Sequence, residues 1–287
     1  MIAHDAFFAK GGQHAVCQDY ALSGALPHGR SYAVLADGCS GSPHTEFGAS
    51  LLCHAIRPYL AAYGSQAGTY AIEAARSTVR GLRIPPKCLD ATLLWATHNP
   101  ETGFATACIT GDGVVLAQRW TGELETHHFS HPGEAPYYLS YLLDAERERR
   151  YRKEHGHAVQ YRYWDGTTHK ETWKPAQPAS PFLLHLEHST YRLLVLCSDG
   201  ISTFTRPTET GQREAVPLTD VAHALLGDLR LTKGAFLQRR ARAFARFCTH
   251  NEWTHYDDIS LAGFAFDRPV ANGLDTRPAE AAPIQQE

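Results

Sequence analysis

Aspartate residues recur where apolar stretches of this sequence stop or start. The run "SYAVLADG" ends in Asp37, the run "YRLLVLCSDG" ends in Asp199, and a glycine follows each acid. Asp19 in "CQDYA" and Asp257 in "HYDDIS" stand just before strand-like residues. Taken alone, Asp37 and Asp199 are typical of turns, because Asp-Gly pairs favour hairpin turns. Asp19 alone is typical of an exposed loop, and Asp257 alone is typical of a solvated strand edge. Their repeated position at strand ends indicates that folding could bring them together.

Several carboxylates in one place would repel one another strongly unless they were protonated or neutralised. Hard divalent cations neutralise them well, since Mg²⁺ and Mn²⁺ prefer carboxylate, carbonyl and water oxygens. Gly38 has no side chain, so its carbonyl could approach such an ion closely. Two ions about 4 Å apart can hold a bridging hydroxide and stabilise the oxyanion that forms when it attacks. The acids therefore predict a metal-dependent hydrolytic site.

The residues around these acids predict an α+β domain in which helices cover antiparallel sheets. Short apolar runs bounded by Gly or Pro predict strands at residues 3–9, 31–36, 91–98, 104–110, 114–120, 124–129, 182–187, 191–198 and 258–266. Apolar residues at helical spacing predict helices at residues 45–63, 69–83, 218–228 and 233–250. Pro58 is expected to kink or end the first helix. The strands between residues 91 and 129 predict an antiparallel meander.

The composition excludes several classes of protein. The 287 residues are 43% hydrophobic and 20% charged, which is ordinary for a globular protein. A net charge of −3 indicates neither nucleic acid nor an anionic membrane as a bulk partner. No apolar run is long enough to span a membrane, and the start of the chain does not resemble a signal peptide. Seven cysteines without a CxxC pair predict a reduced, cytoplasmic protein, and the 17 scattered histidines predict surface positions rather than a metal site.

The segment from residue 132 to residue 180 differs from its surroundings. It is rich in charged and aromatic residues and lacks a clear period. We interpret it as a surface insertion within a single domain spanning residues 1–267. Two roles remain open for this insertion: a solvated decoration, or a lid beside the metal site that grips a substrate. The Pro, Ala, Glu and Gln residues at 268–287 predict a disordered tail.

Six motifs together resemble the protein phosphatase 2C family, the PPM group of metal-dependent Ser/Thr phosphatases, most closely its bacterial branch. In order along the chain they are "QDYA", "AVLADGCSGS", "DATLLWA", "CITGDGVV", "LLVLCSDGIS" and "DDISLAGFAF". The resemblance runs from about residue 5 to residue 266. It implies a four-layer α-β-β-α sandwich, in which two antiparallel sheets are flanked by helices.

The resemblance also assigns roles to individual residues. Asp37 matches the acid that bridges two metal ions, and the Gly38 carbonyl matches a ligand of the second ion. Asp19 matches an acid on the second-ion side, and Asp112 matches one that helps to hold a third, weaker ion. The implied metal ligands, held for Mg²⁺ or Mn²⁺, are Asp19, Asp37, Gly38, Asp112, Asp199 and Asp257.

Some positions depart from the family pattern. His14 stands where an arginine usually grips the phosphate, and an imidazole is a poorer anion clamp than a guanidinium. Arg30 or an arginine of residues 132–180 could take over that role. Gln18 stands where many members have Glu. The usual histidine after the first Asp-Gly is missing, so His44 is our candidate for the acid that protonates the leaving group.

Asp258 stands where the family commonly has Asn, which makes Asp257 and Asp258 competing candidates for one ligand position. We favour Asp257 by its place in the motif. Replacing Asp258 by Asn is then expected to be mild, because it restores the common residue.

The resemblance implies hydrolysis of phosphoserine or phosphothreonine in proteins by a metal-bridged hydroxide, with Asp37, His14 and His44 as the catalytic side chains. It implies a phosphoprotein substrate and, by association, a cognate Ser/Thr kinase. Two alternatives stay open. One is a pseudophosphatase that binds phosphoproteins without turnover, and the other is a hydrolase of small phosphate esters or nucleotides. The chain has no GxxxxGK phosphate loop and no CxxxxxR motif of a thiol phosphatase.

Overall fold

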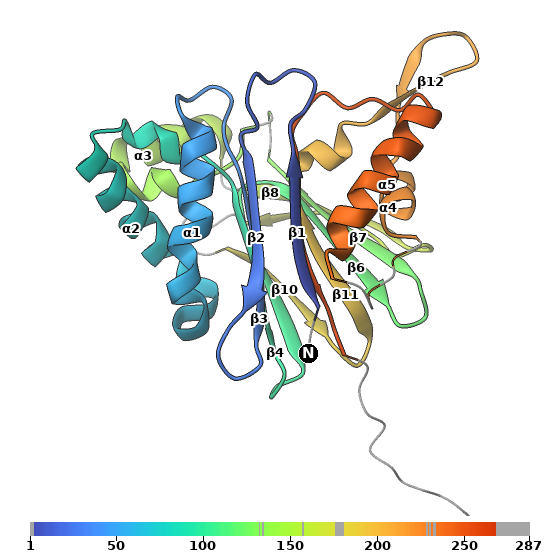
Figure 1. Cartoon of the computed structure of the whole chain (residues 1–287). Helices are drawn as coiled ribbons and strands as arrows, with labels where there is room; N and C mark the ends of the chain where they lie inside the picture. Colours follow the sequence, from blue (N-terminus) through green and yellow to red (C-terminus); the bar gives the residue numbers. More distant parts are fainter. Residues whose placement is uncertain are drawn as a thin grey trace, which may run out of the picture.

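Two antiparallel sheets stacked face to face form the centre of the molecule (Figure 1). The structure is a computed structural model, and it describes residues 3–131, 133, 135–156, 158–175, 181–227, 229, 231 and 234–267. The predicted tail at 268–287 lies outside the described residues.

The first sheet has seven strands, in the order β1 (His4–Ala9), β14 (Ile259–Ala265), β11 (Tyr191–Cys197), β6 (Gly113–Arg119), β7 (Leu124–Ser130), β8 (Ala158–Trp164) and β9 (His169–Pro175). The second has five, in the order β10 (Phe182–Glu187), β5 (Phe104–Thr110), β4 (Leu93–Asn99), β3 (Ser31–Asp37) and β2 (Asp19–Ala25). The predicted meander is wrong in one respect, since β5 and β6 belong to different sheets. β2 was not predicted.

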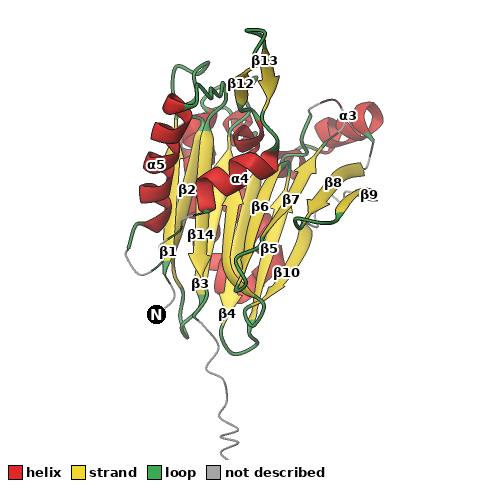
Figure 2. Cartoon of the chain, turned by 90° about the vertical axis from the view of Figure 1, so that its right-hand side faces the viewer, coloured by secondary structure: helices red, strands yellow, loops and turns green. Residues whose placement is uncertain are grey.

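Helices cover the outer face of each sheet, as Figures 1 and 2 show. α1 (Thr45–Tyr63) and α2 (Ala67–Leu82) pack on the five-stranded sheet, whereas α4 (Leu218–Leu226) and α5 (Phe236–His250) pack on the seven-stranded sheet. α1 continues through Pro58 to Tyr63, contrary to the expected break. Pro58 has no N–H group, so the carbonyl of His54, four residues earlier, lacks its usual partner in the helix. Both residues are exposed, so water can hydrogen-bond to that carbonyl.

The alternation of side chains along β3 explains the four layers. Tyr32, Val34 and Ala36 face α1 and α2, whereas Ala33 and Leu35 face the other sheet. Successive strand residues point to opposite faces, so a strand that is apolar throughout must be covered on both sides. The helices supply one cover and the partner sheet supplies the other. The structure therefore confirms the predicted α-β-β-α sandwich.

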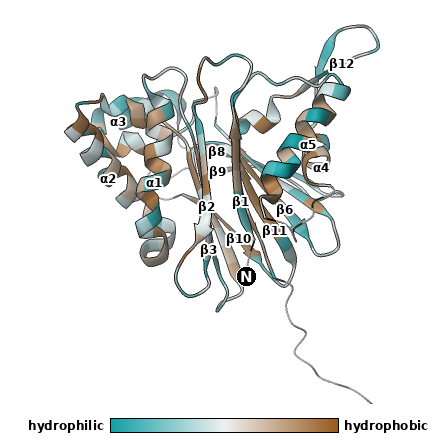
Figure 3. Ribbon diagram, in the orientation of Figure 1, coloured by the Kyte–Doolittle hydropathy of each residue, from teal (hydrophilic) through white to brown (hydrophobic). Residues whose placement is uncertain are grey.

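The segment at 132–180 contains regular structure. The short 3₁₀ helix η4 (Leu139–Leu143) and α3 (Ala145–His155) lie on the side of α1 and α2, and the β8–β9 hairpin extends the seven-stranded sheet (Figure 1). A second hairpin, β12 (Thr205–Pro207) and β13 (Arg213–Ala215), projects beyond α5 and is mainly hydrophilic in Figure 3. Other 3₁₀ turns are η1 (Gly64–Gln66), η2 (Pro86–Leu89) and η5 (Asp199–Ser202). Within the described ranges, no helix combines the length and apolarity needed to cross a bilayer.

Candidate metal centre

A small polar pocket of about 200 Å³ opens at the end of the sandwich where β3 leads into α1. It gathers six of the residues that the sequence singled out. Its lining consists of His14, Asp37, Gly38, Cys39, Ser40, Thr92, Asp112, Pro136, Tyr138, Asp199 and Asp257. Four of these side chains are carboxylates, and they come from segments that are far apart in the sequence.

Asp19 lies behind this pocket rather than in its lining. It starts β2 directly opposite Asp37, the last residue of β3. Its side chain is buried, and neither carboxylate oxygen has a hydrogen-bond partner of good geometry among the described residues. Burial raises the pKa of Asp19 to about 7, although the nearby hydroxyls of Ser198 and Ser260 favour the charged form.

The other acids share this electrostatic problem. Burial raises the pKa of Asp37 well above its usual range, and the charges of Asp19 and Asp199 raise it further. The pKa of Asp112 is also raised well above its usual value, by burial and then by the charge of Asp199. Burial and Asp199 raise the pKa of Asp257 as well. Without a bound cation, the surroundings of these aspartates therefore disfavour their negatively charged forms.

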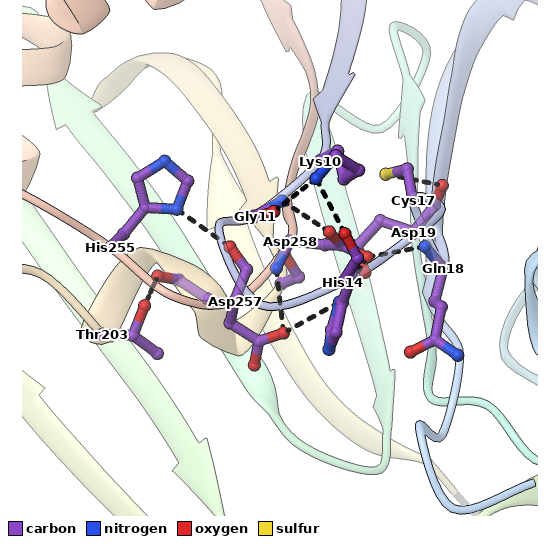
Figure 4. A network of polar contacts seen from close by, with 12 residues as sticks. Lys10, Gly11, His14, Cys17, Gln18, Asp19, Thr203, His255, Asp257 and Asp258 are labelled. Atoms are coloured by element: carbon purple, nitrogen blue, oxygen red, sulfur yellow. Dashed lines mark hydrogen bonds and ion pairs between the residues drawn. The ribbon is translucent and has the colours of Figure 1, made fainter.

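The neighbouring acids Asp257 and Asp258 have different surroundings, as Figure 4 shows. Asp257 lines the pocket and is 26% exposed, whereas Asp258 is 1% exposed. The Asp258 carboxylate accepts hydrogen bonds of 2.6 Å from the backbone N–H groups of Gly11 and Gln18. Asp258 therefore holds the β1–β2 loop in place, and Asp257 is the one of the two acids that faces the pocket.

Three glycines make these close approaches possible. A Cβ on Gly11 would come within 2.2 Å of the Asp257 backbone, and one on Gly200 would come within 1.8 Å of the Asp258 carbonyl oxygen. Gly38 is similarly crowded, with Thr45 at 2.7 Å from where its Cβ would be. Its N–H donates to the Gln18 carbonyl at 3.2 Å. The glycine after each strand-end acid is thus required by packing at this end of the sandwich.

His14 is the basic side chain that borders the acids. Its Nδ1 atom lies 2.9 Å from Asp258 Oδ2 and 3.8 Å from Asp257 Oδ1 (Figure 4). Neither arginine alternative replaces it in the pocket. Arg30 donates to the Ala61 carbonyl at 3.3 Å, and Arg147, from the segment at 132–180, is paired with Asp90. Among the described residues, the pocket lining contains no arginine or lysine.

The structure does not bring His44 to the pocket. His44 precedes α1 in a left-handed backbone conformation, its side chain is 63% exposed, and it lies 3.8 Å from Glu46. The turn that starts α1 directs the chain away from the acids after Ser40, which is why a histidine four residues later does not reach them. The candidate role of His44 as the acid for the leaving group therefore has no support in the geometry.

Sequence reasoning missed a buried cluster that braces one wall of the pocket. Asp90 is 2% exposed, and its two carboxylate oxygens accept from one nitrogen of Arg147, Nη2, at 3.0 and 3.1 Å. It also accepts from the hydroxyls of Ser42 at 2.7 Å and Ser140 at 2.5 Å. The Asp90 cluster, which we define as these four residues, joins the loop after Asp37 to the segment at 132–180. The strand-edge position of Asp90 in "LDATLLWA" was the only signal in the sequence.

The Asp90 cluster fixes residues that border the acids. Pro136 and Tyr138 of the segment at 132–180 line the pocket, and Ser140 and Arg147 follow them along the chain. The hydroxyl of Tyr151, in α3, also donates to the Ala135 carbonyl at 2.7 Å. This part of the insertion is consequently a wall of the pocket, anchored by an ion pair.

The donor set suits hard divalent cations. Asp37, Asp112, Asp199 and Asp257 could supply carboxylate oxygens and Gly38 a carbonyl, and both Asp19 oxygens and Asp199 Oδ1 lack hydrogen-bond partners among the described residues. In the part of the chain that the structure describes, no three acid, His or Cys side chains converge closely enough to enclose an ion by themselves.

A larger cavity of about 510 Å³ lies beside α5, between Phe7, Phe204, Phe244 and Trp253. Its described lining is mostly apolar and contains no carboxylate. It therefore lacks the oxygen donors that the smaller pocket concentrates, and we do not assign the metal centre to it.

Comparisons with solved structures support the fold. A bacterial serine phosphatase superimposes with a TM-score of 0.55 at 11% identity, covering 94% of this chain and 100% of that one. The serine/threonine phosphatase Stp1 from Staphylococcus aureus gives a TM-score of 0.54 at 13% identity, over 93% and 96% of the two chains. A chain that holds the PP2C phosphatase domain and a fragment of the regulatory domain of SpoIIE from Bacillus subtilis gives a TM-score of 0.54 at 12% identity, over 94% of this chain and 65% of that one.

A search of curated protein sequences gave no significant match. The sequence profile described as protein phosphatase 2C matches residues 11–228, which is well over half of the chain. That range contains Asp19, Asp37, Asp112 and Asp199, and the structure adds Asp257 from beyond it to the same pocket. The chain belongs to the protein phosphatase 2C family.

Proposed function

We propose that this protein is a metal-dependent phosphatase that hydrolyses phosphoserine or phosphothreonine in proteins. The observation that carries the proposal is the convergence of Asp37, Asp112, Asp199 and Asp257 on one small pocket, with Asp19 buried behind it. Membership of the protein phosphatase 2C family supports the reaction class. A Ser/Thr kinase would be the enzyme that supplies such a substrate, because these phosphate esters arise by phosphoryl transfer.

Each part of the pocket has a role in this proposal. Asp19, Asp37, Asp112, Asp199, Asp257 and the Gly38 carbonyl would hold two Mg²⁺ or Mn²⁺ ions and a weaker third. When bound, these ions would lower the pKa of a water molecule and offset charge on the phosphate. His14, held beside Asp258, would orient a phosphate oxygen through its exposed ring edge. Tyr138 and Pro136 would flank the substrate residue and limit the entry of water.

A metal-dependent assay tests the proposal. The parent protein should hydrolyse p-nitrophenyl phosphate and a phosphothreonine peptide with Mn²⁺, and EDTA should abolish both reactions. Asp199→Asn should lower kcat/KM by about 100-fold or more, since even outer partners of metal ligands are worth about 10- to 100-fold. Asp220→Asn removes an exposed acid of α4 and is the matched control. Equal activity of the two variants would contradict the site assignment.

A second candidate is a pseudophosphatase that binds phosphoproteins without turnover. It is favoured by His14 at the position of the usual arginine and by the lack of arginine or lysine in the described pocket lining. A guanidinium stays charged at every physiological pH, whereas an imidazole does not. Binding of a phosphopeptide with Mn²⁺, without release of phosphate over hours, would favour this candidate over the enzyme.

A further inference from the structure

A basic groove lies apart from the metal centre, at the end of α2. It encloses about 460 Å³ and is lined by Arg76, Arg80, Arg83, Ile84, Pro85 and Pro86. The arginines are spaced by four and three residues, so they lie along one face of the helix and its cap. All three are exposed, in a chain whose net charge is −3.

The guanidinium groups of these arginines make few ion pairs within the described residues. Arg76 lies 3.5 Å from Glu73, a contact between two exposed side chains on the same helix. Arg80 and Arg83 have no carboxylate partner within ion-pair distance among the described residues. A cation in the last turn of a helix is favoured by the helix dipole, which accounts for Arg80 alone. It does not account for three arginines that line one concave surface.

The local backbone builds the groove. Arg83 takes a left-handed conformation with φ of 58°, and Ile84 donates its N–H to the Val79 carbonyl at 2.9 Å. This closes α2 in the way that a glycine usually does, and the chain turns back so that Pro85 and Pro86 form the apolar side. Prolines have no N–H and present a rigid flat surface, so an occupant would be held by the arginines and packed against the prolines.

The groove is close to the metal centre along the chain. Pro86 borders the groove, and Thr92, six positions later in the chain, lines the metal pocket. An extended chain covers at most about 3.6 Å per residue, so Pro86 and Thr92 are at most about 22 Å apart. A peptide bound at the pocket would reach the groove with about six of its own residues.

We propose that this groove docks an acidic segment of the phosphoprotein substrate, within about six residues of the phosphorylated residue. The inference rests on the proposed function and adds a substrate class to it. Carboxylates on the segment would pair with the arginines, which bind planar anions in a bidentate manner. Docking outside the pocket would add binding energy for a protein substrate and none for a small ester.

The test compares two twelve-residue phosphoserine peptides, one with four Glu residues within six positions of the phosphoserine and one with Gln in their place. Fluorescence anisotropy in EDTA measures their binding without turnover, and kcat/KM is then measured with Mn²⁺. Arg76→Gln/Arg80→Gln should weaken binding of the acidic peptide about tenfold at low salt, as expected for two exposed ion pairs. The Gln peptide and p-nitrophenyl phosphate should be unaffected.

Arg242→Gln/Arg246→Gln is the matched control, because it removes the same charge from exposed positions of α5. If both double variants weaken the acidic peptide equally, bulk charge and not the groove is responsible, and the proposal is wrong. It is also wrong if parent protein binds the two peptides equally, or if a single-stranded oligonucleotide of equal charge competes as well as the acidic peptide. If parent protein hydrolyses no substrate yet binds the acidic peptide through Arg76 and Arg80, the catalytic proposal fails and the groove stands.

Discussion

Substitution of Asp258 by Asn separates a residue that holds the site together from one that would act in it. Asp258 accepts two backbone N–H groups on different carboxylate oxygens, both at 2.6 Å, and lies 2.9 Å from His14. An Asn amide has one acceptor oxygen, so its NH₂ group would face either the Gly11 or the Gln18 N–H. The family resemblance alone predicts a mild effect, whereas these contacts predict a clear loss of stability.

The size of the loss follows from the broken bond. A hydrogen bond to a charged group contributes about 1.5–3 kcal/mol, and a buried N–H without an acceptor costs about the same. We expect Asp258→Asn to lower the free energy of unfolding by about 2 kcal/mol. For a domain of this size, that corresponds to a fall in Tm of about 4–8 °C. The measurement is thermal unfolding in EDTA, so that bound metal does not contribute.

Asp257→Asn is the matched comparison, one residue away. It removes a charge from a crowded pocket and leaves the bonds of Asp258 in place, so its metal-free Tm should not fall. Its Mn²⁺-dependent turnover should fall about 100-fold. If Asp257→Asn instead lost several degrees of Tm while Asp258→Asn melted like the parent, our assignment of the two acids would be refuted.

Three further predictions concern the same end of the molecule. The folded-state pKa of Asp19 is raised to about 7 from its ordinary 3.8, so its stabilising contribution is complete below pH 4 and is lost as pH rises through 7. Asp19→Asn in EDTA should therefore raise Tm relative to the parent protein at pH 8 and change Tm little at pH 4. Asp90→Asn breaks a buried ion pair with Arg147 and should lower the free energy of unfolding, measured by chemical denaturation, by about 3–5 kcal/mol. The double variant Asp90→Asn/Arg147→Met should recover part of that stability, and no recovery would argue against the pair. His14→Arg supplies the guanidinium that the family usually has at this position, so KM for p-nitrophenyl phosphate should fall several-fold, and an unchanged KM would show that this position does not contact phosphate.

Much of the fold and part of the site could be predicted from the sequence, because they depend on neighbours along the chain. Apolar periodicity located α1, α2, α4 and α5 and most strands to within a few residues, since side-chain spacing follows directly from backbone geometry, whereas the polar helix α3 was missed. Asp37 and Asp199 were recognisable because each ends an apolar strand before a glycine. The order of six motifs then indicated the family that the profile comparison establishes.

Contacts between distant parts of the chain decided the rest. Asp257 and Asp258 are adjacent in the sequence, and their different surroundings come from the backbone N–H groups of Gly11 and Gln18, which lie 247 and 240 residues from Asp258 in the chain. Arg147 and Asp90 show the same dependence across 57 residues. β5 and β6 follow each other in the sequence like strands of one meander, but they pair in different sheets. The local sequence pattern does not indicate which sheet a strand will join. Local spacing fixes where a side chain points from its own strand, whereas what it meets there depends on the packing of the whole chain.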